Sequence, residues 1–207
     1  GARLLLVATR PADGRIDLSD LANRQQLVAD LRYLAETYFD QPGYLTIDGR
    51  PVVFLYLTRI YAGEVAEAFA EARAAVREAT GQELFIIGDE VYWHYPTRSR
   101  LVLFDGVTAY NMHTSVTGIE VGFAEKVTAH YGVWAQAAAA EGVAFVPDVL
   151  PGFDDTAVRP EARHPVIPRS VELFSAQLEA AVPLASGAAR IVMLTSPPTI
   201  SVQWRRW

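Results

Sequence analysis

Carboxylate, amide and aromatic side chains recur directly after the short apolar runs of this sequence. Three acidic residues in such places, Asp89, Glu90 and Asp148, are the candidate catalytic residues. The candidate substrate-binding residues are Tyr56, Tyr92, Trp93, Tyr110, Asn111 and Asp154. Carboxylates and amides hydrogen-bond sugar hydroxyls, aromatic rings stack on the apolar face of a pyranose, and cleavage of a glycosidic bond uses two carboxyl groups. The pattern therefore indicates a carbohydrate site.

Each of these residues also has a purely structural interpretation. Asp89 and Glu90 are equally suited to capping a following helix or to pairing with an arginine. The Tyr92–Trp93 segment is suited to packing on a helix layer, and Asn111 to forming a turn. Asp is a common turn residue, so Asp148 would bond a loop backbone and Asp154 would form an Asx-type turn. The sequence leaves both sets of interpretations open.

Alternating strands and helices are the elements that must position these residues. Continuous apolar runs rich in β-branched residues predict six strands buried on both faces. These runs are Leu4–Ala8, Val52–Leu57, Leu84–Ile87, Val107–Tyr110, Ala144–Pro147 and Ile191–Leu194. Helical spacing and caps predict four helices. They are Asp20–Phe39 after an N-cap at Ser19 or Asp20, Ala66–Ala79, Phe123–Glu141 closed by Gly142, and Pro168–Ala181.

This alternation predicts right-handed βαβ units and a parallel sheet, in one domain over residues 1–207. Two architectures fit: an open doubly wound sheet, and a (β/α)8 barrel that lacks two units. A complete barrel takes about 250 residues, whereas this chain has 207 and enters an apolar run at once. Neither Gly-x-Gly-x-x-Gly nor a P-loop motif occurs. We therefore expect a TIM-barrel-type α/β fold without its first two βα units and its last helix.

Composition excludes several function classes. The chain has 51% apolar residues, no cysteine and a net charge of −6. The charge argues against nucleic-acid binding, and no apolar run approaches the roughly 20 residues that span a membrane. The four histidines lack metal-binding spacing, and no Gly-x-Ser-x-Gly motif occurs. We expect a soluble protein without metal or cofactor, whose partner is an oligosaccharide or polysaccharide.

The segment from Tyr38 to Tyr56 carries a family resemblance, with Ile47-Asp48-Gly49-Arg50-Pro51 at its centre. It resembles glycoside hydrolase family 99, a group that includes endo-α-mannosidases and the WbsX-like proteins of polysaccharide gene clusters. Phe104–Asn111 and Val149–Asp155 match the same group in the same order, so the resemblance covers about residues 4–196. Independently of the family, Asp48-Gly49 predicts a tight turn that leads into a strand beginning near Pro51.

The resemblance implies a (β/α)8 barrel, retaining hydrolysis of α-mannosidic links, and a glutamate pair in a motif similar to Asn-Glu-Trp-His-Glu after the last strand. Here Ile191–Ser196 is followed by Pro197-Pro198-Thr199-Ile200, and no glutamate follows Glu179. We expect a glycoside-hydrolase-like protein that acts on or binds an α-linked, mannose-type glycan, without the glutamate pair and inactive as given. The alternative is a non-catalytic carbohydrate-binding or polysaccharide-assembly protein on the same scaffold. A third hypothesis is an open α/β domain that acts on another small polar ligand.

Overall fold

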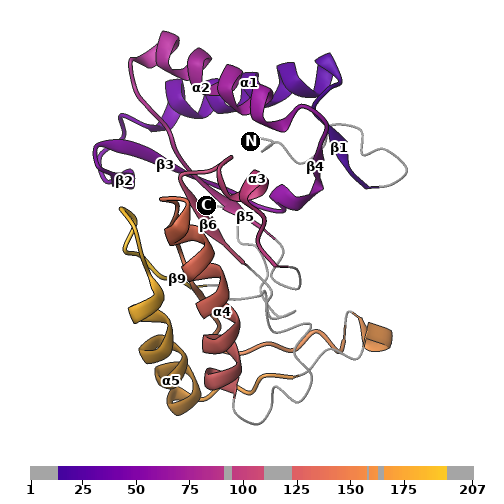
Figure 1. Cartoon of the computed structure of the whole chain (residues 1–207), viewed down its shortest axis with the longest axis vertical. Helices are drawn as coiled ribbons and strands as arrows, with labels where there is room; N and C mark the ends of the chain where they lie inside the picture. The colour runs from indigo at the N-terminus through magenta and orange to yellow at the C-terminus, as the bar shows by residue number, and fades with distance from the viewer. Residues whose placement is uncertain (1–13, 91–94, 110–122, 158, 163–165, 195–207) are drawn as a thin grey trace. The chain divides into compact units, whose positions relative to one another are not determined.

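The computed structural model describes residues 14–90, 95–109, 123–157, 159–162 and 166–194 (Figure 1). These residues form two compact units. The first contains residues up to 90 together with 98–107, and the second contains 91–97 and the residues from 108 onward. Each unit has its own buried apolar side chains and is described by itself. Within the described residues, no helix combines the length and apolar character that crossing a bilayer requires.

The first unit combines a small sheet with two long helices. Its strands are β1 (Ile16–Asp17), β2 (Thr46–Ile47), β3 (Arg50–Leu55), β4 (Tyr61–Ala62), β5 (Phe85–Asp89) and the start of β6 (Gly106–Thr108). Its helices are α1 (Leu21–Tyr38), η1 (Thr58–Ile60, a 3-10 turn), α2 (Val65–Thr80) and α3 (Arg98–Leu101). The sheet order runs β2, β3, β5, β6, and β1 pairs with β4 separately.

The centre of this unit is the parallel pair β3 and β5. Val52 lies opposite Phe85, and Leu55 lies opposite Gly88. Every residue of β5 is buried, as expected for a parallel strand that is covered on both faces. The predicted parallel arrangement is therefore confirmed for these two strands.

A hairpin leads into β3. Asp48 and Gly49 have φ values of +50° and +73°, and they join β2 to β3 in an antiparallel pair. Two successive residues with positive φ are typical of the two-residue hairpin turn that suits the twist of the strands. The predicted tight turn is confirmed, while the short strand β2 before it was not predicted.

Helices α1 and α2 lie side by side (Figure 1). Asp20 caps α1, because its carboxylate accepts a hydrogen bond of 2.7 Å from the Ala22 N–H. Leu27 and Leu31 of α1 and Phe69 of α2 are buried. Both helices lie within two residues of their predicted bounds.

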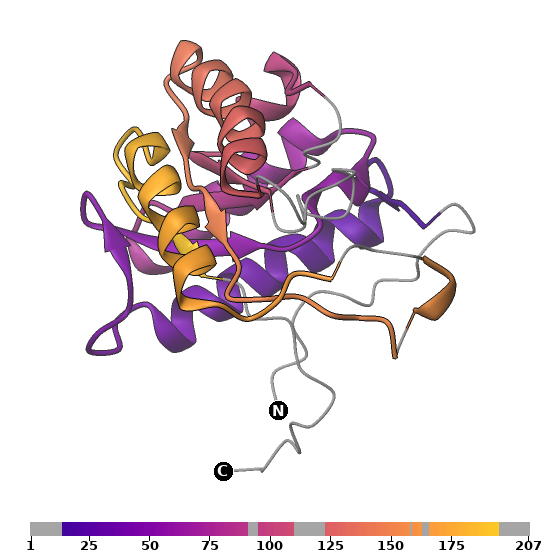
Figure 2. The ribbon, with the colours of Figure 1, turned by 90° about the horizontal axis from the view of Figure 1, so that it is seen from below.

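The second unit is built around α4 (Phe123–Ala140) and α5 (Val171–Ala181), which pack together (Figures 1 and 2). Its other elements are β7 (Ala144–Phe145), β8 (Asp148–Val149), η3 (Pro160–Ala162), η4 (Val182–Leu184) and β9 (Met193–Leu194). Gly142, with φ of +70°, follows the end of α4, as predicted. Strands β8 and β9 pair in parallel, which is the orientation predicted for the sheet, but each spans only two residues and β8 lies just after the predicted strand Ala144–Pro147.

Two of the differences from the predicted boundaries have a clear physical cause. Helix α5 begins at Val171 instead of Pro168, because the Ser170 hydroxyl caps it by accepting a hydrogen bond of 3.1 Å from the Leu173 N–H. Strand β3 ends at Leu55 instead of Leu57, because Leu57 has a φ of +57° and turns the chain. The predicted strand Leu4–Ala8 lies outside the described residues.

Candidate functional site

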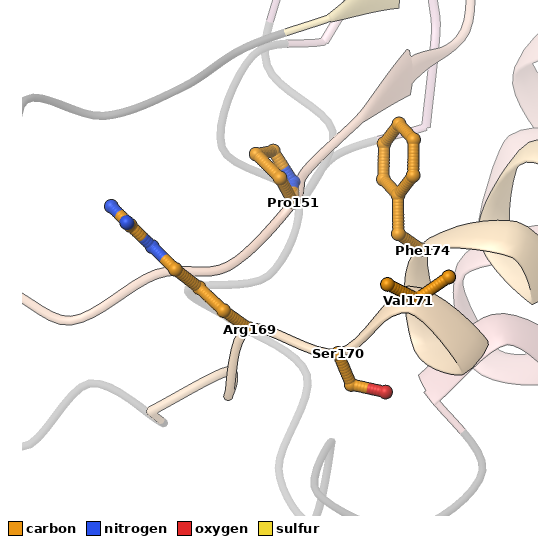
Figure 3. Close-up of a pocket in the computed structure, with 5 residues that line it drawn as sticks. All are labelled: Pro151, Arg169, Ser170, Val171 and Phe174. Carbon is orange, nitrogen blue, oxygen red and sulfur yellow. The ribbon is translucent and has the colours of Figure 1, made fainter.

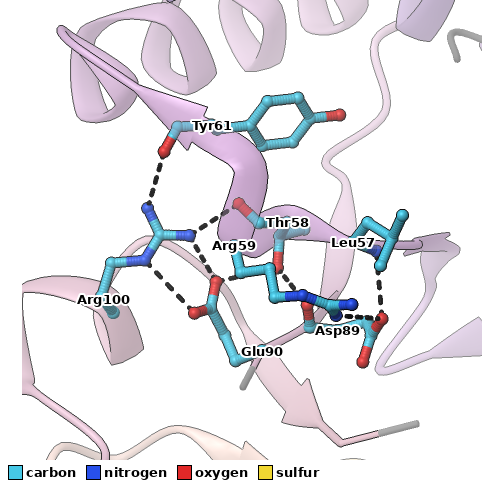
Figure 4. Close-up of polar contacts among 7 residues, drawn as sticks. All are labelled: Leu57, Thr58, Arg59, Tyr61, Asp89, Glu90 and Arg100. Carbon is cyan, nitrogen blue, oxygen red and sulfur yellow. Dashed lines mark hydrogen bonds and ion pairs between the residues drawn. The ribbon is translucent and has the colours of Figure 1, made fainter. Parts of the chain in front are cut away.

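Two adjacent carboxylates stand at the carboxyl end of β5 in the first unit (Figure 4). Asp89 is the last residue of β5, and Glu90 follows it. Because β3 and β5 are parallel, their carboxyl ends lie at the same edge of the sheet. The turn at Leu57 therefore brings Thr58 and Arg59 toward these carboxylates.

Asp89 is held by the turn that follows β3. Its side chain is almost fully buried, and its Oδ2 accepts a hydrogen bond of 3.0 Å from the Leu57 N–H. The same oxygen lies 3.6 Å from Nη1 of Arg59. The structural interpretations of Asp89 were capping a following helix and pairing with an arginine. The contact with Arg59 agrees with the second, and the bond to the Leu57 N–H was not predicted.

Glu90 is a buried carboxylate that pairs with Arg100 from α3. Only 3% of Glu90 is exposed. Its Oε1 accepts hydrogen bonds from Arg100 Nη2 and, at 2.8 Å, from the Thr58 hydroxyl, and its Oε2 accepts one of 3.3 Å from Arg100 Nε. Arg100 also donates to the main-chain carbonyls of Thr58 and Tyr61. This arginine therefore joins Glu90 to the segment between β3 and β4.

The two carboxyl groups point in different directions. Figure 4 shows Asp89 directed toward Leu57 and Arg59, and Glu90 directed toward Arg100. Adjacent residues along an extended chain project to opposite faces. A glycosidase pair, in contrast, flanks a single bond, with the carboxyl groups about 5 to 9.5 Å apart. The arrangement is that of two separately paired charges.

A third carboxylate organises the opposite end of β5. Asp105 accepts hydrogen bonds of 2.6 Å from both Arg50 and Arg73, and one of 2.9 Å from the Ile86 N–H. Burial acts to raise the pKa of Asp105. The hydrogen bond from Ile86 and the charge and hydrogen bonds of the two arginines outweigh burial, so the pKa is lowered. This cluster ties β3, α2 and β5 together.

The second unit contains the remaining described candidates. Asp148 is buried in β8, where its main-chain carbonyl accepts a hydrogen bond of 2.7 Å from the Tyr131 hydroxyl. Asp154 is exposed, and its Oδ1 accepts hydrogen bonds from the hydroxyl and the N–H of Thr156. These bonds lower the pKa of Asp154. The Asx-type turn suggested for Asp154 is confirmed, and its role toward substrate stays a prediction.

Sequence reasoning found some members of the β5 site and missed others. Tyr56, which was predicted, lies on the same turn as Leu57 and is 45% exposed. Thr58 and Arg100, in contrast, were not recognised as partners of Glu90. No short motif links Glu90 to an arginine ten residues later, so no local signal existed. The candidates Tyr92, Trp93, Tyr110 and Asn111 lie outside the described residues, and their roles stay predictions.

The part of the chain that the structure describes contains no cluster of side chains suited to a metal ion. There, no group of three or more His, Asp or Glu side chains is arranged to hold a metal ion. The carboxylates of Glu90, Asp105 and Asp89 accept hydrogen bonds from arginine or main-chain donors.

Comparison with known proteins places this geometry in a fold group. No family model matches the sequence, and no curated protein does. A glycoside hydrolase-like protein of known structure superimposes with a TM-score of 0.72 and 24% identity, over 89% of this chain and 56% of that protein. An endo-α-mannosidase of family 99 from Bacteroides thetaiotaomicron superimposes with a TM-score of 0.60 and 23% identity, over 84% of this chain and 49% of the enzyme. This chain is similar in fold to glycoside hydrolase family 99.

The family 99-like fold confirms the expected TIM-barrel-like α/β architecture. The chain spans about half the length of these two solved structures. In TIM barrels, the functional side chains stand at the carboxyl ends of the strands. Tyr56, Asp89 and Glu90 stand after β3 and at the end of β5, so they occupy the corresponding edge of the first unit.

Proposed function

We propose that this chain binds an α-linked, mannose-type glycan on a glycoside-hydrolase-like scaffold and cleaves it little or not at all. The similarity in fold to a family 99 endo-α-mannosidase is the observation that carries the glycan assignment. The motifs around Asp48-Gly49, Phe104-Asp105 and Pro151-Gly152 add to it, because they occur in the order expected for this group.

The proposed binding edge follows from the barrel geometry. Tyr56 is 45% exposed just after the carboxyl end of β3, and a partly exposed aromatic ring can stack on a sugar. Tyr92 and Trp93 follow β5 in the sequence, and Tyr110 and Asn111 follow β6. In the first unit, Tyr56 is the proposed stacking residue. For Tyr92, Trp93, Tyr110, Asn111 and Asp154, a contact with a glycan stays a prediction.

Weak or absent hydrolysis follows from the state of the carboxylates. A glycosidase needs one carboxyl group to protonate the leaving oxygen and a second to act at the anomeric carbon. Both oxygens of Glu90 already accept hydrogen bonds from Arg100 or Thr58, so a substrate would have to displace these partners. Asp89 is directed elsewhere, toward Leu57 and Arg59.

The sequence supports the same conclusion. Pro197-Pro198-Thr199-Ile200 contains no ionisable side chain, although it stands where the resemblance implies a glutamate pair. Asp89, Glu90 and Asp148 are then the remaining candidate catalytic residues. The engaged Glu90 specifically favours the second candidate function, a non-catalytic carbohydrate-binding or polysaccharide-assembly protein on the same scaffold.

Calorimetric titration with an α-linked manno-oligosaccharide tests the binding claim. We expect saturable binding by the unaltered chain, and a loss of affinity of about fivefold or more in Tyr56→Ala, since removing a well-placed aromatic contact commonly costs about 1 kcal/mol or more. Tyr33→Ala is the matched control, because Tyr33 is also about half exposed (48%, against 45% for Tyr56) but lies on α1. Absence of saturable binding to any α-mannoside would remove the proposal. Equal affinities of the two variants would remove Tyr56 from the binding edge.

A further inference from the structure

A hollow in the second unit lies where the segment after β8 meets the start of α5 (Figure 3). Its volume is about 400 Å³, and it is lined by Pro151, Arg169, Ser170, Val171 and Phe174. In Figure 3 the Arg169 side chain and the Phe174 ring lie on opposite sides of Pro151. This volume lies toward the lower end of the range for small-molecule sites, roughly 300–1,000 Å³.

The wall of the hollow formed by Pro151 is fixed on one side by Gln177. This α5 side chain is 2% exposed, and its amide clamps the main chain of Leu150. Gln177 Nε2 donates to the Leu150 carbonyl at 3.0 Å, and Gln177 Oε1 accepts from the Leu150 N–H at 3.1 Å. A buried amide that is satisfied on both ends in this way holds Leu150 and the following proline in place.

The same wall is fixed on its other side by a bridge between two loops. Phe153 and Ile167 exchange main-chain hydrogen bonds of 2.9 and 2.8 Å in an antiparallel bridge. Gly152 lies between the two clamps. A Cβ atom there would stand 2.6 Å from Cγ of Arg169 and 3.2 Å from the Ile167 carbonyl oxygen. The absence of a side chain at Gly152 therefore lets the stem of Arg169 pack directly against the main chain.

The lining defines the chemistry of a ligand. Pro151, Val171 and Phe174 present apolar surface, and Val171 is 77% exposed. Arg169 offers only hydrogen-bond donors. A ligand that fits both has an apolar face and oxygen acceptors around its rim. A pyranose ring has these features, because its C–H face is apolar and its hydroxyls radiate from the edge.

The surroundings favour a neutral sugar over an anion. The Ser170 hydroxyl donates a hydrogen bond of 2.8 Å to the Glu172 carboxylate, which places a negative charge next to one of the lining residues. Hydrogen bonds from its own N–H and from Ser170 lower the pKa of Glu172, so the carboxylate is charged at neutral pH. An anionic group bound here would meet both the attraction of Arg169 and this repulsion.

We propose that this hollow is a sugar-binding subsite that holds one neutral hexose ring, with Phe174 and Pro151 against its apolar face and Arg169 donating to its hydroxyls. The inference rests on the proposed function, since its ligand is a ring of the kind of glycan that the chain is proposed to bind. It gives a role to the Pro151-Gly152 motif, which the carboxylates at β5 do not use.

Titration of the full chain with an α-linked manno-oligosaccharide tests the subsite, with two variants and a local probe. We expect Arg169→Gln and Phe174→Leu each to weaken binding by about fivefold or more, since each removes a contact of roughly 1 kcal/mol or more. In the unaltered chain, the methyl resonances of Val171 should shift with the same dissociation constant that calorimetry gives. Arg32→Gln is the matched control for arginine, because Arg32 is exposed on α1 of the first unit, and it should bind like the unaltered chain.

The outcomes separate this inference from the proposed function. Unaltered affinity in Arg169→Gln and Phe174→Leu, together with unmoved Val171 methyl resonances, overturns the subsite while binding by the unaltered chain upholds the proposed function. Absence of binding by the unaltered chain overturns both. If a variant melts at a lower temperature, the Val171 resonances of the unaltered chain still decide the question.

Discussion

The carboxylates at the end of β5 owe their state to partners that are distant in the sequence. Glu90 is joined to Arg100 and Thr58, and Asp89 to Leu57 and Arg59. A buried charge is tolerated only when its partners satisfy it, so loss of a partner costs more than the pair contributes as a whole. At the residue scale, we therefore expect these pairs to contribute to the stability of the fold.

Arg100→Met tests the assignment of Glu90. This change leaves the Glu90 carboxylate buried without its main partner, so we expect a loss of about 3–5 kcal/mol in the free energy of unfolding. Urea denaturation measures it. Arg32→Met is the control, because the pair of Arg32 and Glu36 is exposed and its loss should change stability little. Equal effects of the two substitutions would contradict the buried role of Arg100.

Asp105→Asn tests the charge cluster at the start of β5. The pKa of Asp105 is lowered on folding, so its contribution to stability is fully present above the unfolded-state pKa of about 3.9 and is lost as pH falls through the folded-state value. We expect the variant to be about 1.5–3 kcal/mol less stable at pH 7. The gap should shrink below about pH 4. Denaturation curves between pH 3 and 8 check this, and a gap that persists unchanged at pH 3 would refute the assignment.

Part of this site could be predicted from the sequence. The position of Asp89 and Glu90 after a buried run placed them at a strand end, and pairing with an arginine was one of their expected roles. Arg100 could not be identified, because the contact depends on how α3 folds back toward η1. The Asp105 cluster was missed for the same reason, since Arg50 and Arg73 are 55 and 32 residues away from it.

At the element scale, the long helices were the most predictable parts. The apolar positions of α1 repeat at helical spacing and Asp20 caps it, so a local pattern determines the element. The start of α5 was placed too early because proline suits a first helical turn, whereas the Ser170 cap determines the actual start. Strands β2 and β8 have only two residues each, which is too few to show an alternating hydrophobic pattern. Their formation depends on pairing with neighbouring strands.

At this scale, replacing two glycines with alanine should change the stability of the protein in opposite directions. A Cβ on Gly88 in β5 would lie 2.7 Å from the ring of Phe104, which packs edge-on against Phe69. We expect Gly88→Ala to lower the free energy of unfolding by about 1–3 kcal/mol through overpacking. A Cβ atom on Gly132 in α4 would meet only open space. Gly132→Ala should therefore raise the free energy of unfolding by up to about 1 kcal/mol, because alanine has the higher helix propensity.

Thermal denaturation of both glycine variants gives the measurement. A lower melting temperature for Gly88→Ala and an unchanged or higher one for Gly132→Ala are the expected results. Tolerance of alanine at Gly88 would mean that the Phe104 ring does not define the packing of β5.

At the scale of the whole molecule, the alternation of apolar runs and helices predicted an α/β fold but fitted both an open sheet and a barrel. The chain length, the absence of nucleotide-binding motifs and the family resemblance favoured the TIM-barrel-like fold. The similarity in fold to a glycoside hydrolase-like protein and to a family 99 endo-α-mannosidase agrees with it. The sequence motifs reached the same family because they mark turns and strand starts, as the Asp48-Gly49 hairpin illustrates. Function depends instead on which side chains lie in contact. Such contacts join residues that are distant in the sequence, so catalytic residues are harder to predict from sequence than turns and strand starts.

The central claim is that the chain binds an α-mannoside and does not efficiently cleave it. Saturation-transfer NMR of an α-linked manno-oligosaccharide, followed over hours, measures both properties in one sample. We predict saturation transfer from the protein to the sugar protons, and internal anomeric signals that keep their intensity. Absence of transfer would contradict binding, and decay of those signals at a rate typical of glycosidases would contradict the assignment of Asp89 and Glu90 as structural carboxylates.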